Sequence, residues 1–134
     1  MAGSVSINQE YFGRKRSIIM KCTSDASGDV NGKGIQVQGG DIYAFSYVPE
    51  SGCTDEWDIT VTAKYTKPNG ESIQIADALG GQGADLSNST DGGWINLQAP
   101  FPIIPGTLLT PVLANLGNAQ VVTIILHIWE EILV

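Results

Sequence analysis

The only histidine, His127, is the side chain of this sequence best suited to proton transfer near neutral pH. It lies in an apolar run between Leu126 and Ile128, with no serine or cysteine beside it in a local nucleophile motif. A nucleophilic triad needs such a partner and a carboxylate that orients the imidazole, and no nucleophile-elbow pattern is present. We therefore expect His127 to be structural or to line a pore, and the chain not to be an enzyme.

A second candidate for chemistry is the acidic cluster formed by Asp55, Glu56 and Asp58. Two carboxylates hydrolyse a glycosidic bond only when they face each other across a cleft. Glu56 and Asp58 instead share one face of a predicted strand, close together and in water. The cluster is interpreted as a solvated acidic patch, with calcium binding as the alternative.

Residues 77–93 form the longest polar stretch, and they combine glycine with oxygen-bearing side chains. Asp85, Asn88, Ser89 and Asp91 are the kind of ligands that calcium prefers, but their spacing does not match an EF-hand loop. The glycines between residues 80 and 83 lack both the full dinucleotide pattern and the lysine of a phosphate-binding loop. We expect a long surface loop without cofactor or metal, and calcium stays the alternative.

Cys22 and Cys53 are the only cysteines, and their wide separation fits no metal-binding motif. Buried free thiols in a reducing compartment are the expected state, with a disulfide between the two as the alternative.

Aromatic residues raise the prospect of a sugar-stacking platform. The candidates are Tyr43, Phe45, Tyr47, Trp57 and Trp94. Aromatic side chains in alternating strands more often fill a core, because each buries a large apolar surface. Core packing is therefore expected for most of them, and a carbohydrate-binding module that stacks sugars on Trp94 or Tyr47 stays the alternative function.

The elements that position these side chains are predicted to be strands. Residues 56–65, EWDITVTAKY, alternate apolar and polar side chains, which is typical of a half-buried strand. Similar patterns, separated by Gly, Pro, Asn and Asp turn signals, predict about eight strands. They cover residues 17–23, 35–38, 42–48, 57–65, 72–75, 94–97, 107–114 and 120–129. The predicted fold is all-β, a single-domain antiparallel β-sandwich of jelly-roll-like type.

Three segments carry more specific expectations. Pro111 within 107–114 indicates an edge position or a bulge, because proline cannot donate to a ladder. The run 120–129 is so apolar that both of its faces are expected to be covered. The prolines between residues 100 and 105 predict an extended crossing rather than a strand.

Residues 1–16 are predicted to be an irregular, extended N-terminal arm that precedes a sandwich domain of residues 17–134. The segment lacks sustained periodicity, and its glycines weaken a helix. Its cluster Arg14, Lys15 and Arg16 suits an acidic partner surface. At the other end, the apolar residues Ile132, Leu133 and Val134 suit burial in a subunit contact. These six residues are the predicted partner-binding residues.

Composition limits the classes of partner. The chain has 134 residues and a formal net charge of −7, and residues 22–134 hold thirteen acidic side chains against three lysines. Such a body repels phosphate backbones, so direct nucleic-acid binding is not expected. The sequence has neither a membrane-spanning stretch nor an apolar signal core. Only 16% of the residues are charged, which indicates either a surface covered by partners or one built from small polar residues.

Three pieces of the chain together resemble one protein family. Residues 55–62 read DEWDITVT, residues 79–90 read LGGQGADLSNST, and residues 108–128 read LLTPVLANLGNAQVVTIILHI. This order of strand, glycine-rich loop, hairpin and β-branched last strand is similar to small β-rich virion proteins of tailed bacteriophages. The resemblance spans roughly residues 40–129, and residues 64–68 and the basic arm depart from the pattern.

The resemblance implies a location in the virion capsid or head and a structural role, most simply that of a decoration protein that stabilises the shell. It implies the major capsid protein or neighbouring virion subunits as partners, and a homo-oligomer, with a trimer favoured. It brings no catalytic residue, cofactor or metal, and it suggests neither nucleic acid nor a membrane as partner.

Overall fold

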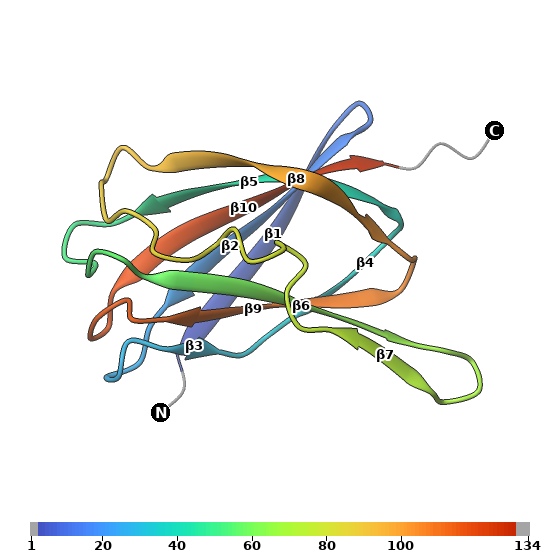
Figure 1. Cartoon of the computed structure of the whole chain (residues 1–134), viewed down its shortest axis with the longest axis horizontal. Helices are drawn as coiled ribbons and strands as arrows, with labels where there is room; N and C mark the ends of the chain where they lie inside the picture. Colours follow the sequence, from blue (N-terminus) through green and yellow to red (C-terminus); the bar gives the residue numbers. More distant parts are fainter. Residues whose placement is uncertain (1–2, 131–134) are drawn as a thin grey trace.

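The computed structural model describes residues 3–130, which form two antiparallel sheets packed face to face (Figure 1). Sheet A contains, in spatial order, β1 (Ser4–Phe12), β2 (Lys15–Thr23), β10 (Val121–Glu130), β5 (Gly40–Pro49) and β8 (Gly93–Ile103). Sheet B contains β3 (Val30–Asn31), β9 (Thr107–Ala114), β6 (Asp58–Thr66) and β7 (Ser72–Ile75), and β4 (Ile35–Val37) also pairs with β9. The predicted all-β sandwich is confirmed.

The core lies between the sheets and follows from the alternation in the sequence. In β10 the even-numbered residues from Val122 to Ile128 are fully buried, and in β6 the odd-numbered residues from Ile59 to Ala63 meet them from the other layer. Successive side chains of a strand point to opposite faces, so each sheet keeps one face for the core and one for the outside. The residues around Leu79 and Leu86, from the loop after β7, close one side of this core.

The expectation of an irregular N-terminal arm is wrong for the described residues 4–12. They form β1, which pairs with β2 along its whole length, from Ser4 opposite Thr23 to Phe12 opposite Lys15. Val5 and Ile7 pack against the core, so a weak but real alternation anchors this edge strand. Its periodicity escapes sequence reasoning because polar residues occupy most of its exposed edge.

Two other expectations also need correction. Strand β8 continues to Ile103, so the proline-rich segment extends the strand at a sheet edge, where missing donors cost little. Pro111 lies within β9, which is not an edge strand, but the neighbouring ladder is interrupted there. On that side β3 pairs with residues 112–113 and β4 with residues 107–109, which leaves Pro111 without a partner that needs its missing N–H.

The most informative difference concerns β10, which was expected to be covered on both faces. It lies at the centre of sheet A, and its inner residues are fully buried. Its outer residues, among them Ile125 and His127, are only half-buried, and Trp129 is exposed. One face of the most apolar strand is therefore only partly covered in the single chain. Among residues 3–130, no helix has the length and apolar character needed to cross a membrane.

Candidate functional site

The outer face of sheet A carries a line of aromatic side chains, which we name the aromatic ridge and define as Trp94, His127, Tyr43 and Trp129. The rings of Trp94 and His127 lie 4.2 Å apart, centroid to centroid. Tyr43 follows at 6.2 Å from His127, and Trp129 lies 5.6 Å from Tyr43. The ridge thus runs across β8, β10 and β5, and Trp94 and Trp129 remain 52% and 44% exposed.

A bulge in β5 contributes to the ridge. The pairing of β5 with β10 shifts register between Ile42 and Ala44, so that Tyr43 is the extra residue. A bulge re-aims a side chain and locally disrupts the ladder, and it is often found at functional positions. Here it places the Tyr43 ring between His127 and Trp129.

Polar partners hold the ridge in place. The Nε2 atom of His127 lies 2.9 Å from the hydroxyl oxygen of Ser46, and the indole N–H of Trp94 donates to the side-chain oxygen of Asn96 at 2.8 Å. Partial burial, and secondarily the positive charge of Lys15, lower the pKa of His127 below its usual value. The lowered pKa favours the neutral imidazole, which suits stacking.

The Ser46–His127 contact does not make a nucleophilic site. No carboxylate among the described residues forms a hydrogen bond with the other ring nitrogen, which a triad requires for orientation. Within residues 3–130 there is also no cluster of three His, Cys, Asp or Glu side chains that suits a metal ion. Stacking and hydrogen bonding are the chemistry that this face offers.

At one end of the same face, five exposed residues form a straight row across all strands of sheet A. Pairing joins Phe12 to Lys15, Lys15 to Trp129, Trp129 to Asp41, and Asp41 to Pro102. We name this set the end row. Directly paired residues of antiparallel strands point to the same side of the sheet, so the five side chains share the outer face. The ammonium of Lys15 lies over the Trp129 ring, 4.9 Å from its centroid.

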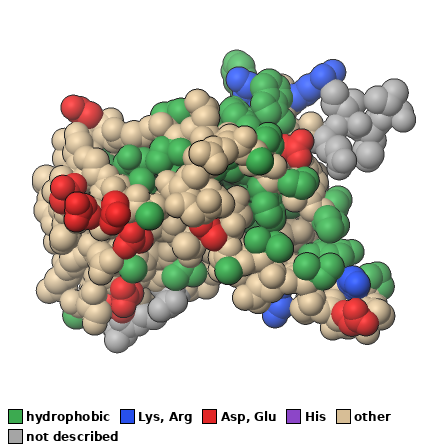
Figure 2. Space-filling model, viewed as in Figure 1, with side chains coloured by type: hydrophobic (Ala, Val, Ile, Leu, Met, Phe, Trp, Pro, Cys, Tyr) green, Lys and Arg blue, Asp and Glu red, His purple; other side chains and the backbone are tan. Residues whose placement is uncertain are grey.

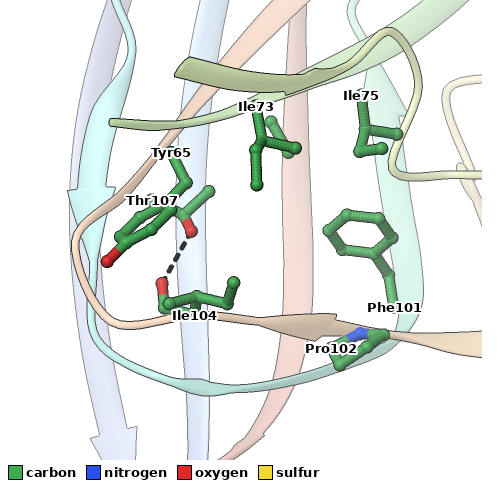
Figure 3. A pocket seen from close by; sticks show the side chains of 8 residues that line it. Tyr65, Ile73, Ile75, Phe101, Pro102, Ile104 and Thr107 are labelled. Carbon is green, nitrogen blue, oxygen red and sulfur yellow. Dashed lines mark hydrogen bonds between the residues drawn. The ribbon is translucent and has the colours of Figure 1, made fainter. Parts of the chain in front are cut away.

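A separate apolar groove lies where the edge strands β7 and β8 approach each other (Figure 3). Ile73 and Ile75 from β7, Phe101 from β8, Ile104 just after β8 and Tyr65 from β6 line a half-open cavity of about 250 Å³. Its lining is almost entirely apolar. Strand β7, which forms one wall of the groove, lies toward the same end of the molecule as the turn between β1 and β2 (Figure 1).

The two ends of the sandwich differ in charge. Figure 2 shows most of the visible Asp and Glu side chains gathered at the end that holds the β5–β6 and β9–β10 turns. Hydrophobic side chains, with Lys and Arg at the β1–β2 hairpin, gather toward the opposite end. Phe12, at the tip of that hairpin, is 85% exposed.

The predicted partner-binding cations separate in the structure. Arg14 and Lys15 are exposed at the β1–β2 turn, but Arg16 is 1% exposed and points into the sandwich. It donates to the carbonyl of Gln38 at 3.0 Å and lies 3.8 Å from the carboxylate of Glu130. Arg16 is thus an internal brace and not part of a basic surface. The apolar tail Ile132, Leu133 and Val134 lies outside the described residues.

Asp55 and Asp58 of the predicted acidic cluster accept hydrogen bonds from loop residues. The two carboxylate oxygens of Asp58 accept from the backbone N–H of Asp85 and from the side-chain amide of Asn115. Asp55 accepts from the backbone N–H of Asn88. Carboxylate acceptors of this kind replace water at turn N–H groups and fix the loop course.

Both cysteines are free and buried. Burial raises the pKa of the Cys22 thiol to about 12, and it raises the pKa of Cys53 as well. Neither thiol is activated for chemistry.

The predicted sugar platform is divided between core and surface. Trp57 and Phe45 are fully buried, and Tyr47 is nearly so, which confirms the expectation of core packing for these three. Only Trp94 and Tyr43 reach the outer face. Sequence reasoning missed His127 and Trp129 as their neighbours, although both occupy the odd-numbered, outward face of β10, which a period of two identifies.

Comparison with known proteins adds little. No family model and no curated protein matches the chain. Among solved structures, it is similar to the CBM22-1 xylan-binding domain of Xyn10C from Paenibacillus barcinonensis, with 14% identity, a TM-score of 0.45, and coverage of 97% of this chain and 83% of that one. It is also similar to CapF with a tropolone inhibitor, with 15% identity, a TM-score of 0.27, and coverage of 96% and 32%. Neither similarity is strong enough to bear on function.

Proposed function

We propose that this protein is a structural component of a tailed-phage particle and that it works by binding neighbouring protein subunits through the outer face of sheet A. The observation that carries the proposal is the half-covered state of β10. A strand with Ile125, His127 and Trp129 on its outer side has the composition of a buried strand, yet the single chain covers that outer side only in part.

The mixture of side chains on this face favours a protein partner. Aromatic rings stand beside aliphatic Ile19 and Ile125, and the exposed lysines of β2, Lys15 and Lys21, lie toward the ends of that strand. Protein interfaces are enriched in aromatic residues at their centre and depleted in charge there. The sequence resemblance to small virion proteins supports the same assignment.

The mechanism is mechanical and needs no bound group. Each copy removes apolar area from water where it meets its neighbours, and a symmetric shell multiplies that contact over many copies. A decoration protein acts this way by raising the cost of opening a seam between capsid subunits.

The assignment is tested by searching for the chain in particles. Mass spectrometry of gradient-purified phage from the source of this gene is expected to detect the protein in the particle band. Purified chain is expected to rebind to particles that lack it, and Trp94→Ala is expected to weaken this rebinding by about tenfold or more. Thr62→Ala, on the outer face of sheet B, is the matched control and is expected to rebind normally.

Absence of the chain from particles would refute the particle assignment. Equal rebinding of the Trp94→Ala and Thr62→Ala variants would refute the use of sheet A.

A carbohydrate-binding module is the second candidate, favoured by the exposed Trp94 ring with the amide of Asn96 fixed beside it. A flat aromatic ring with a neighbouring hydrogen-bonding group is what sugar recognition requires. Titration of tryptophan fluorescence with a panel of plant and bacterial polysaccharides distinguishes the two. Saturable quenching that Trp94→Ala abolishes would favour the glycan, whereas flat titrations would remove this candidate.

A further inference from the structure

The end row has a symmetry that points to its partner. Read across sheet A, it is apolar, basic, aromatic, acidic and apolar, in the residues Phe12, Lys15, Trp129, Asp41 and Pro102. When this row is set against a reversed copy of itself, each apolar end residue lies opposite the other apolar residue, and the basic residue lies opposite the acidic one. We propose that a second copy of this chain docks on the outer face of sheet A about a two-fold axis that runs along β10.

The geometry of such a dimer follows from the strand pairing alone. A two-fold axis parallel to β10 and above it places Trp129 against Trp129 of the second copy. Lys15 then faces Asp41 of the second copy, and Phe12 faces Pro102 of the second copy, with each contact made twice. This self-complementarity is what an isologous interface demands.

Charge complementarity favours this partner over an unrelated one. Lys15 and Asp41 stand on opposite sides of Trp129 in the single chain, two strands apart, so neither neutralises the other directly. The structure gives neither of them an ion pair within the described residues. In the dimer, Lys15 and Asp41 of each copy face the opposite charge of the other copy. These pairs favour this orientation of the two copies over one in which like charges meet.

The size of the face is adequate for a stable contact. Five strands at about 4.8 Å spacing, and the ten residues of β10 at about 3.3 Å each, give a face of about 24 Å by about 33 Å. This is about 800 Å² per copy, the area that each partner contributes to an interface of standard size. The aromatic ridge would lie inside this contact, and aromatic residues are among those that dominate the binding energy of protein interfaces.

This inference deepens the proposed function, on which it rests, by naming the neighbour on sheet A. It also replaces the trimer favoured by the resemblance with a two-fold unit. In a particle, such a dimer leaves the outer face of sheet B free to meet other subunits.

Charge reversal tests the pairing directly by sedimentation equilibrium of the purified full chain. The wild-type protein is expected to be a dimer. Lys15→Asp and Asp41→Lys are each expected to weaken dimerisation by at least about tenfold, because like charges then face each other twice. The double variant Lys15→Asp/Asp41→Lys is expected to regain dimerisation.

Mixing the two single variants provides a sharper readout. A heterodimer of Lys15→Asp with Asp41→Lys restores opposite charges at both contacts, so the mixture is expected to form a one-to-one dimer that neither variant forms alone. Lys64→Asp, on the outer face of sheet B, is the matched control and is expected to dimerise as the wild type does. Circular dichroism verifies that each variant is folded.

A monomeric or trimeric wild type would overturn the proposal. So would single variants that dimerise normally, or a mixture that fails to form the heterodimer. These outcomes are distinct from failure of the particle assignment, because a monomer found in purified particles would refute only the two-fold contact.

Discussion

The outer faces of the two sheets differ although both sheets build the same core. The outer face of sheet B has no aromatic side chain on its two central strands: Thr60, Thr62 and Lys64 of β6 lie opposite Val112, Thr110 and Leu108 of β9. Sheet A shows a face that carries the aromatic ridge and half-buried isoleucines. Both strand sets alternate with a period of two, so folding alone does not explain the difference.

Sheet B shows that an outer face of this sandwich can be stable in water without aromatic side chains. Sheet A carries more aromatic surface on its outer face than the fold requires. Exposed aromatic rings contribute little to the stability of a single chain, because much of their surface stays in water. Their presence on one face only is therefore better explained by binding.

The largest expected effect separates core tryptophan from ridge tryptophan. Trp57 is fully buried, meets Tyr47 edge to face with ring centroids 5.5 Å apart, and donates to the carbonyl of Ser87 at 2.9 Å. Trp57→Ala is expected to lower the free energy of unfolding by about 3–5 kcal/mol. Trp94→Ala is expected to lower it by less than about 1 kcal/mol, since half of that side chain is already in water.

Urea denaturation of both variants, followed by circular dichroism, measures the two costs. Similar losses of stability for Trp94→Ala and Trp57→Ala would show that the ridge is a structural part of the fold, and the contrast between the faces would lose its functional meaning.

An intermediate effect is expected at Asp77, which fixes the loop that closes the side of the core. Its carboxylate accepts from the backbone N–H groups of Val61, Leu79 and Gly81. Asp77→Ala leaves these donors without their acceptor and is expected to cost about 1–3 kcal/mol of unfolding free energy. Dimerisation is expected to persist, because the loop is no part of the outer face of sheet A.

Thermal unfolding and sedimentation of the same sample measure both properties, with the exposed Asp91→Ala as the control. A variant at Asp77 that loses dimerisation while keeping its stability would place the loop, and not the ridge, in the interface.

The smallest expected effect concerns pH. Because partial burial lowers the pKa of His127 in the folded chain, the unfolded chain binds a proton first as the pH falls below about 6.5. The free energy of unfolding is thus expected to decline as the pH falls from about 6.5 to the folded-state pKa of His127. Below that pKa, both states bind the proton, and this group causes no further loss of stability. His127→Gln is expected to flatten the dependence between about pH 7.5 and about pH 5.5, as measured by urea denaturation of dilute protein. A wild-type protein that becomes more stable over that fall in pH would contradict the environment described for the ridge.

Much of the fold was predictable from the sequence, and the reasons are local. The strands at residues 72–75 and 107–114 were predicted with the bounds that the structure gives them, because turn residues and alternation mark their ends. Strand β1 was missed because only Val5 and Ile7 carry its alternation, and its partner β2 supplies the rest of its stability.

The candidate site was less predictable, since it depends on strand order. The sequence places Trp94 and Trp129 far apart, and only the arrangement β2-β10-β5-β8 brings them onto one face. The prediction that Arg14, Lys15 and Arg16 form one basic surface fails for a related reason. Alternation sends Arg16 inward and Lys15 outward, so adjacent charges that look alike in sequence end on opposite faces.

Hydroxyl-radical footprinting tests the central claim most directly, by comparing the dilute single chain with the chain in its assembled state. Trp94 and Trp129 are expected to be oxidised readily in the single chain and to become protected on assembly, while Trp57 stays protected in both. Equal oxidation of Trp94 and Trp129 in both states would contradict the claim that the outer face of sheet A is where this protein meets its neighbours.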